Sequence, residues 1–222
     1  MEKATASKSA KSKTSQADKI KKAYKEYVLE NGTQPSSIFK FVKELKVKEE
    51  VFYEEFNSFE AVEQDIWLGL LHQTTEAIQA EEVYDQYSAR EKLLAFYYTL
   101  IEVMKAERSF ILQTARFDPR AGMTPDFLKT FKKHFMEFID EVLLEAQETE
   151  EVKTRPYISE RYRDGIWVQF LFVVRFWVKD DSRGFEKTDA AIEKAVNLSF
   201  DLMGRGPLDA MVDFAKFLYQ NR

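Results

Sequence analysis

Apolar residues recur every three or four positions along most of this chain, the spacing of one face of an α-helix. The first such stretch begins after Ser15 and stops at Gly32, and two shorter ones follow at about 37–45 and 48–56. The segment from Asn57 to Glu60 has the pattern of a helix start, and a longer apolar face continues from it towards Ala80. We therefore expect three short helices followed directly by a long one.

The rest of the chain carries the same periodicity. Further helices are predicted at about 88–106, 109–115, 124–142, 159–178 and 185–202, and from Leu208 onwards. The most apolar run, 166–178, is 13 residues long and falls short of the ~20 residues that span a bilayer. The pattern predicts an all-α protein with about nine or ten helices, which is not an integral membrane protein.

Composition agrees with a packed helical protein and narrows its chemistry. Among 222 residues there are 19 Phe but only 7 Gly and 5 Pro. So few Gly and Pro residues provide few of the tight turns that a many-stranded sheet needs. The absence of Cys removes disulfides, thiolate nucleophiles and zinc–thiolate sites. His72 and His134 lack metal-site spacing, and no phosphate-binding loop or nucleophile elbow occurs. We therefore predict no catalytic residues, no metal and no cofactor.

Charge is distributed unevenly, although the net charge is only −5. Residues 1–25 hold eight Lys and two acids, whereas residues 49–85 hold eleven acids and no Lys or Arg. Residues 1–14 are polar and Lys/Ser-rich, which predicts a disordered tail without the apolar core of a secretory signal, and hence a cytoplasmic protein. We divide the remainder into a head at 15–60 and a body at 61–222.

Several positions between residues 18 and 66 follow a fixed order and spacing. They are Gly32, Ser37, Phe41-Val42, Val47, Phe52-Tyr53, Phe56 and Ser58-x-Glu60. In this order, the segment resembles the helix-turn-helix head of the TetR family of transcriptional regulators. The resemblance implies a DNA-binding head on a helical body that forms a homodimer and encloses an apolar ligand pocket. It places DNA contacts at Ser37, Lys46, Lys48, Glu49, Glu50 and Tyr53.

The positions that depart from the TetR pattern are those that should touch DNA. Lys46 replaces the turn glycine, Lys48 replaces the serine or threonine that starts the recognition helix, and Phe59 replaces a phosphate-binding lysine. Four carboxylates, those of Glu49, Glu50, Glu54 and Glu55, lie on or beside that helix. Because DNA affinity depends on cationic neutralisation of phosphates, this sequence argues against conventional operator binding.

The aromatic residues of the body predict either a solid core or a pocket for an apolar small molecule or lipid. The residues expected to line such a pocket are Tyr97, Ile101, Phe131, Phe135, Trp167 and Phe170, with Gln113 and Arg116 as its polar groups. The stretch 166–178 is apolar on nearly every face, so it must be covered all round, by a core or by a second subunit. The expected dimer interface contains Phe172, Phe176, Trp177, Ile192 and Val196.

A second, shorter resemblance runs from Trp177 to Gly204. The sequence Asp181-Ser182-x-x-Phe185-x-x-Thr188, followed by Asn197 and Met203-Gly204, is similar to the end of the TetR-fold lipid-binding proteins of ubiquinone biosynthesis. Helix-capping Asp and Ser side chains explain the same residues. Two functions stay open: a homodimeric, ligand-responsive transcriptional regulator, and a TetR-fold lipid- or partner-binding protein that has lost DNA binding.

Overall fold

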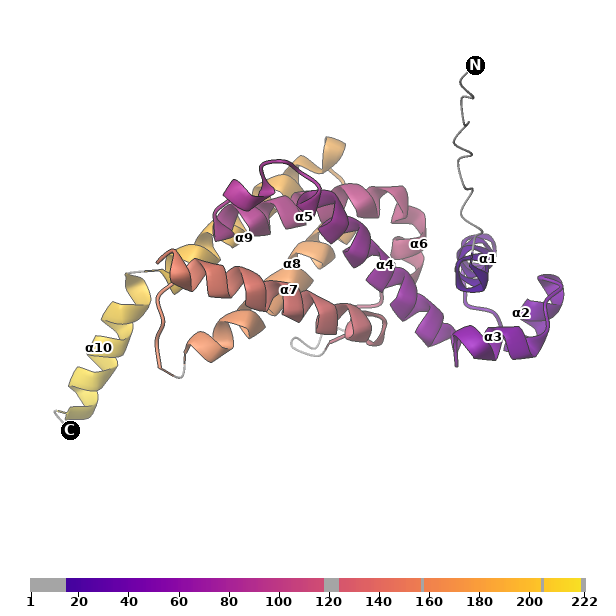
Figure 1. The fold of residues 1–222 in the computed structure, drawn as a ribbon, viewed down its shortest axis with the longest axis horizontal. Helices are drawn as coiled ribbons and strands as arrows, with labels where there is room; N and C mark the ends of the chain where they lie inside the picture. Colours follow the sequence, from indigo (N-terminus) through magenta and orange to yellow (C-terminus); the bar gives the residue numbers. More distant parts are fainter. Residues whose placement is uncertain (1–14, 118–123, 157, 205, 221–222) are drawn as a thin grey trace, which may run out of the picture. The chain divides into compact units, whose positions relative to one another are not determined.

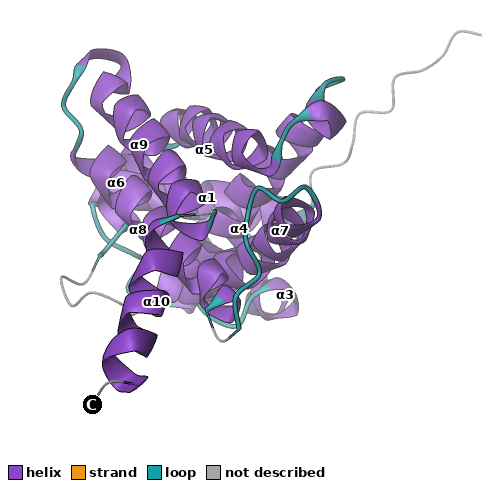
Figure 2. Cartoon of the chain, turned by 90° about the vertical axis from the view of Figure 1, so that its left-hand side faces the viewer, coloured by secondary structure: helices purple, strands orange, loops and turns teal. Residues whose placement is uncertain are grey.

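The computed structural model describes residues 15–117, 124–156, 158–204 and 206–220. Within these ranges the chain forms ten α-helices and four short 3-10 helices and contains no strand (Figures 1 and 2), which confirms the predicted all-α class. The predicted tail at 1–14 lies outside the described residues. None of the helices in the described ranges has both the length and the apolarity needed to cross a membrane.

Two compact units make up the chain, residues 1–62 and 63–222, and the division falls inside α4 (Phe59–Gln79). The head contains α1 (Gln16–Asn31), α2 (Ile38–Glu44) and α3 (Glu49–Glu55). The hydroxyl of Ser15 accepts the Asp18 N–H at the start of α1, and the hydroxyl of Ser37 accepts the Lys40 N–H at the start of α2. These caps satisfy N–H groups that have no partner inside a helix.

Four aromatic rings form the core of the head. Phe41 lies edge-on to Phe52 and to Phe59, with centroids 6.4 and 5.4 Å apart, and Tyr24 stacks on Phe59 at 5.4 Å. Phe59 is therefore a core residue of this head, at the position where the TetR pattern has a phosphate-binding lysine.

Six further helices complete the body after α4. They are α5 (Ala89–Ala106), α6 (Arg108–Thr114), α7 (Lys129–Glu148), α8 (Tyr162–Lys179), α9 (Glu186–Met203) and α10 (Pro207–Gln220), with 3-10 turns η1 (Tyr84–Gln86), η2 (Asp126–Leu128), η3 (Ser159–Arg161) and η4 (Arg183–Phe185). Helix α5 packs on α7 and α9, and α8 packs on the same two helices (Figure 1). One continuous apolar core fills the space between them.

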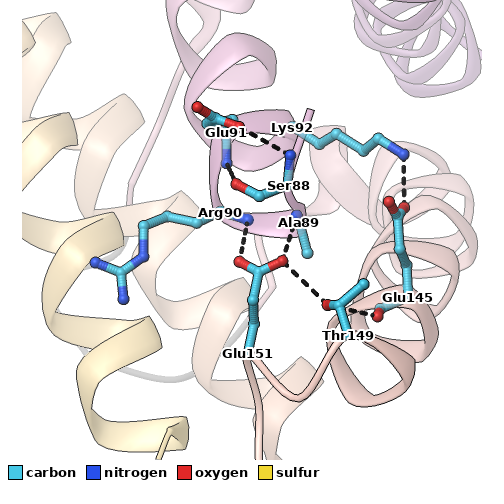
Figure 3. Close-up of polar contacts among 8 residues, drawn as sticks. All are labelled: Ser88, Ala89, Arg90, Glu91, Lys92, Glu145, Thr149 and Glu151. Carbon is cyan, nitrogen blue, oxygen red and sulfur yellow. Dashed lines mark hydrogen bonds and ion pairs between the residues drawn. The ribbon is translucent and has the colours of Figure 1, made fainter. Parts of the chain in front are cut away.

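The start of α5 is tied to the end of α7 by polar contacts (Figure 3). Ser88 and Glu91 form a capping box, and the carboxylate of Glu151 accepts the backbone N–H groups of the first two residues of α5 at 2.9 and 3.3 Å. Nearby, the Lys92 ammonium donates to the Glu145 carboxylate at 2.6 Å. Because Glu151 lies beyond α7, this cap joins segments that are distant in the sequence.

Candidate functional site

The outer face of α3 is acidic. Glu49, Glu50, Tyr53 and Glu54 line a shallow hollow of about 430 Å3, and Tyr53 is 53% exposed. Among the residues predicted to contact DNA, Lys46, Lys48, Glu49, Glu50 and Tyr53 are exposed, whereas Ser37 is partly buried as the cap of α2. This face therefore presents an aromatic ring among carboxylates.

The turn between α2 and α3 has an unusual backbone at Lys46. Its φ is +56°, in the left-handed region that glycine adopts without steric cost. The Lys46 N–H donates to the Lys43 carbonyl at 3.2 Å, so the turn keeps a hydrogen bond with a lysine at the position of the TetR glycine. The resemblance to the TetR pattern therefore predicted the position of this turn correctly.

Replacing Lys46 with glycine is expected to stabilise the head by about 0.5–1 kcal/mol, because glycine removes the left-handed strain that a side chain creates. Hydrogen exchange of the α2 and α3 amides measures this gain. Lys43→Gly is the matched control, since Lys43 is exposed within α2, and it is expected to lose about 1 kcal/mol. If Lys46→Gly instead destabilises the head, the left-handed backbone at Lys46 is not strained.

The predicted aromatic residues of the body do come together. Tyr97, Ile101, Phe131, Phe135, Trp167 and Phe170 are all buried in one cluster. The Phe170 ring lies at the centre of this group, 4.7 Å from Phe131, 4.9 Å from Phe135 and 5.0 Å from Trp167. These rings touch one another directly.

The polar groups of this cluster differ from those that the sequence suggested. Gln113 and Arg116 are exposed, so the structure does not place them among the buried rings. Instead, the Trp67 and Trp167 indole N–H groups and the Tyr97 hydroxyl are buried and have no hydrogen-bond partner in the described part of the chain. Burial raises the pKa of Tyr97 far above its usual value, so its hydroxyl stays protonated and is a donor. Sequence reasoning missed these donors because they belong to residues that normally serve packing.

An apolar groove of about 800 Å3 runs between α8 and α9. Its lining combines the small residues Gly165, Ala190, Ala191 and Ala195 with the larger apolar residues Val168, Phe172, Phe176 and Leu198, and it also includes Lys187 and Lys194. Val168 and Leu198 are each 59% exposed and Phe172 is 49% exposed. This is a large apolar surface to leave in contact with water.

Only part of the predicted dimer interface lies in this groove. Phe172 and Phe176 line it, with ring centroids 5.8 Å apart. Trp177, Ile192 and Val196 are instead fully buried in the core of the body. Because α8 is apolar on nearly every face, the sequence did not distinguish the face that packs inside the subunit from the face that is exposed.

Buried charged groups hold both ends of α9. At its start, the Asp180 carboxylate accepts four hydrogen bonds, from the backbone N–H and the hydroxyl of Ser182 and of Thr188, at 2.6–2.9 Å. Burial raises the pKa of Asp180, but these hydrogen bonds outweigh it and leave the pKa at about 2. At the end of α9, the buried Arg155 guanidinium donates to the carbonyls of Met203 and Gly204. Each charge has the sign that the helix dipole favours.

Sequence reasoning missed Asp180 and selected its neighbour. In the segment similar to the lipid-binding proteins, Asp181 is exposed and pairs with Lys187 at 2.9 Å. Ser182 and Thr188 from the same segment both donate to Asp180. Ser182 and Thr188 of this resemblance therefore contribute to a helix start.

The two histidines lie together, although 61 residues separate them in sequence. The His72 and His134 rings are 5.9 Å apart, and His134 Nδ1 lies 3.0 Å from the Glu137 carboxylate. Within the described ranges, no group of three or more His, Cys, Asp or Glu side chains is arranged to hold a metal ion.

A three-helix head with a helix-turn-helix and a larger helical body defines the class of this protein. Residues 92–218 match the family model described as "Tetracyclin repressor-like, C-terminal domain", which covers more than half of the chain. The chain belongs to the TetR family, as its sequence predicted.

Two solved structures have a similar fold. A putative TetR family transcription regulator from Shewanella sp. PV-4 has 16% identity and a TM-score of 0.57, covering 85% of this chain and 98% of that one. A protein of unknown function from Rhodococcus sp. RHA1 has 13% identity and a TM-score of 0.57, covering 88% of this chain and 99% of its own. No curated protein matches the sequence. At these identities the similarity concerns the fold alone.

Proposed function

We propose that this chain is a non-enzymatic, cytoplasmic, homodimeric TetR-family regulator that responds to an apolar small molecule. The observation that carries the regulatory role is the head itself, in which α2, the left-handed turn at Lys46 and α3 have the order and spacing of a helix-turn-helix. The exposed α8–α9 groove supports dimerisation, because a second copy would remove its apolar surface from water.

The buried aromatic cluster supports the ligand assignment. A pocket that opens among Phe131, Phe135 and Phe170 would be lined by rings, and the unpaired donors of Trp67, Tyr97 and Trp167 would select a molecule that carries hydrogen-bond acceptors. The ligand class is therefore an apolar compound with one or more carbonyl-type oxygens.

A second function is favoured by the acidic face of α3. Glu49, Glu50 and Glu54 are exposed where a TetR-family reader meets DNA, and carboxylates repel the phosphates of a duplex. The alternative is a TetR-fold lipid- or partner-binding protein whose head no longer recognises DNA. Both functions share the same dimer and the same apolar interior.

The deciding experiment measures the binding of the full-length protein to labelled genomic fragments by fluorescence anisotropy near ~100 mM salt, where phosphate contacts are strongly salt-dependent. Lipids that co-purify with the protein are identified in parallel by mass spectrometry. Fragment-selective, salt-sensitive binding would exclude the alternative. Absence of DNA binding together with a defined bound lipid would exclude the regulator.

Neutralising the acidic face tests whether α3 meets DNA. The double variant Glu50→Gln, Glu54→Gln is expected to bind a selected fragment several-fold more tightly, because two repulsive charges are removed near the phosphates. The control, Glu141→Gln, Glu148→Gln, makes the same change at exposed positions of α7 and is expected to leave the affinity unchanged. An equal gain in both variants would indicate a general charge effect.

A further inference from the structure

We propose that α10 folds back on its own chain and covers the α8–α9 groove, where it competes with a second copy. The docking of α10 does not depend on the proposed homodimer, whereas the competition rests on it. Three features of the body point to this contact: the exposed apolar side of α10, a groove of matching length that begins where α9 ends, and a glycine link between the two.

The helix α10 is amphipathic, and its apolar side is exposed. Its four charged or amide residues follow one another at helical spacing: Asp209, Asp213, Lys216 and Gln220. Met211, Phe214 and Leu218 have the same kind of spacing on the apolar side, and each of them is more than half exposed. A helix of 14 residues is only marginally stable by itself in water, so it depends on a surface that covers this side.

An apolar surface begins at the end of α9, next to the start of α10. A pocket of about 300 Å3 is lined there by Leu202 and Met203, and it shares Gly165 and Ser199 with the α8–α9 groove. The two hollows therefore form one surface, which runs back along α9 as far as Lys187. At about 1.5 Å per residue, this surface follows about 24 Å of α9, and α10 is about 21 Å long. The helix and the surface match in length.

The link between α9 and α10 is anchored at Gly204 and can turn at Gly206. The Gly204 N–H donates to the Phe200 carbonyl at 2.7 Å, and the Gly204 carbonyl accepts from the buried Arg155 guanidinium. Gly206 has a φ of +147°, a conformation that residues with a side chain rarely adopt. Rotation at Gly206 therefore reorients α10 while α9 stays in place. Two antiparallel helices joined by so short a link form a helical hairpin.

In such a hairpin, large side chains of α10 lie over small residues of α9. Leu218 is the twelfth residue of α10 and Ala191 is the thirteenth from the end of α9, so the two meet at a similar distance from the turn. By the same count, Phe214 lies beside Ala195. Small residues leave the space into which the large side chains of a second helix pack. Charge agrees, because the described lining includes Lys194 and no acid, whereas α10 has two acids and one lysine.

Docked α10 occupies the surface that the proposed homodimer uses. Phe172 and Leu198 are then covered within one chain, and a second copy binds only the fraction of chains in which α10 is released. The measured dissociation constant of the dimer is therefore higher than that of the open groove, by the reciprocal of this fraction. The C-terminal helix is thus an inhibitor of dimerisation that is built into the chain.

Disulfide formation within one chain reads the docked position directly, because the sequence contains no cysteine. The full chain carries Leu218→Cys together with Ala191→Cys, and a disulfide needs Cα atoms about 4.4–6.8 Å apart. Leu218 lies about 18 Å from Gly206 along α10, so the bond forms only when α10 runs back along α9. Leu218→Cys with Glu193→Cys is the matched control, since Glu193 is exposed on α9 and does not line the groove. Under oxidation in dilute solution, the first pair is expected to close at least about tenfold faster.

A more polar α10 is expected to strengthen the dimer. In the double variant Phe214→Gln, Leu218→Gln, the dissociation constant measured by sedimentation should fall at least about fivefold, because more chains have an open groove. The control Leu112→Gln, Leu144→Gln makes a similar change at exposed positions of α6 and α7 and is expected to leave the constant unchanged. All four side chains are exposed, so the fold should be kept, and circular dichroism checks it.

The outcomes separate docking from competition. Equal closure rates of the two cysteine pairs, or disulfides that join only different chains, overturn the docking of α10 on its own groove. A dissociation constant that is unchanged or higher in Phe214→Gln, Leu218→Gln overturns the competition. If the parent chain and this variant both stay monomeric, the proposed homodimer is overturned, while fast closure of the Leu218→Cys, Ala191→Cys pair still supports the docking.

Discussion

Replacing Phe172 with glutamate is expected to convert the proposed dimer into a monomer, with the dissociation constant rising at least about 1000-fold. Phe172 is 49% exposed in one subunit and lines the α8–α9 groove. Two-fold symmetry places the substitution in the interface twice, so two carboxylates lose their hydration in a groove that is mostly apolar and is also lined by Lys187 and Lys194. Burying an ion costs several kcal/mol, a cost that a nearby cation often does not offset, and the monomer avoids it by keeping the carboxylate in water.

Sedimentation at micromolar protein concentrations measures this change, and circular dichroism checks that the monomer stays folded. Leu144→Glu is the matched control, because Leu144 is 60% exposed on α7 and is not part of the groove. The control is expected to remain dimeric. An intact Phe172→Glu dimer would place the interface elsewhere, and the exposed Met211, Phe214 and Phe217 of α10 form the next apolar surface to examine.

Replacing Asp180 with alanine is expected to lower the free energy of unfolding by about 3 kcal/mol. The variant removes a buried carboxylate that accepts four hydrogen bonds from Ser182 and Thr188 at the start of α9. Thr188 is fully buried, so its N–H and hydroxyl lose a partner that water cannot readily replace. Urea unfolding of the full chain measures the loss.

The contribution of Asp180 to the free energy of unfolding also depends on pH. The pKa of this carboxyl is about 2 in the folded chain, below its ordinary value of 3.8, because the hydrogen bonds from Ser182 and Thr188 outweigh the effect of burial. A lowered folded pKa stabilises the protein above pH ~4, and this stabilisation is lost as the pH falls towards ~2. The difference in stability between the parent chain and Asp180→Ala should therefore shrink across this interval.

Asp181→Ala is the control for Asp180. Asp181 is exposed, and its ion pair with Lys187 lies at the surface, so the expected change is within about 0.5 kcal/mol. Equal losses in the two variants would contradict the capping role of Asp180 and would assign the effect to the turn as a whole.

The helical class and the head were predictable because their signals are local. Ser15 and Ser37 accept backbone N–H groups three residues ahead, and Gly32 ends α1 with a φ of +71°. Lys46 occupies the left-handed turn at the glycine position of the family pattern. Such features depend on the backbone within a few residues, so residue order and spacing were sufficient to predict them.

The assignment of residues to a site was less complete. The aromatic positions of the pocket prediction did prove to be neighbours, since helix periodicity already placed them on inward faces. Periodicity did not separate the two apolar faces of α8, so Phe172 was grouped with Trp177 although the first is exposed and the second is fully buried. Which face is covered depends on how α7 and α9, the helices before and after α8 in the chain, pack against it, and the residue pattern of α8 alone does not specify that packing.

Polar residues show the same contrast between local and distant partners. Asp180, Arg155 and Gln169 gave no signal in the sequence, because an acid in a turn, an arginine in a loop and a glutamine in an apolar helix are individually ordinary. Arg155 meets the carbonyls of Met203 and Gly204, and Gln169 meets Ser199, thirty or more positions away. The residue pattern determines the helices and their caps, because both depend on backbone hydrogen bonds between residues close in sequence. The packing of helices against one another determines which polar groups are buried and which of them have hydrogen-bond partners.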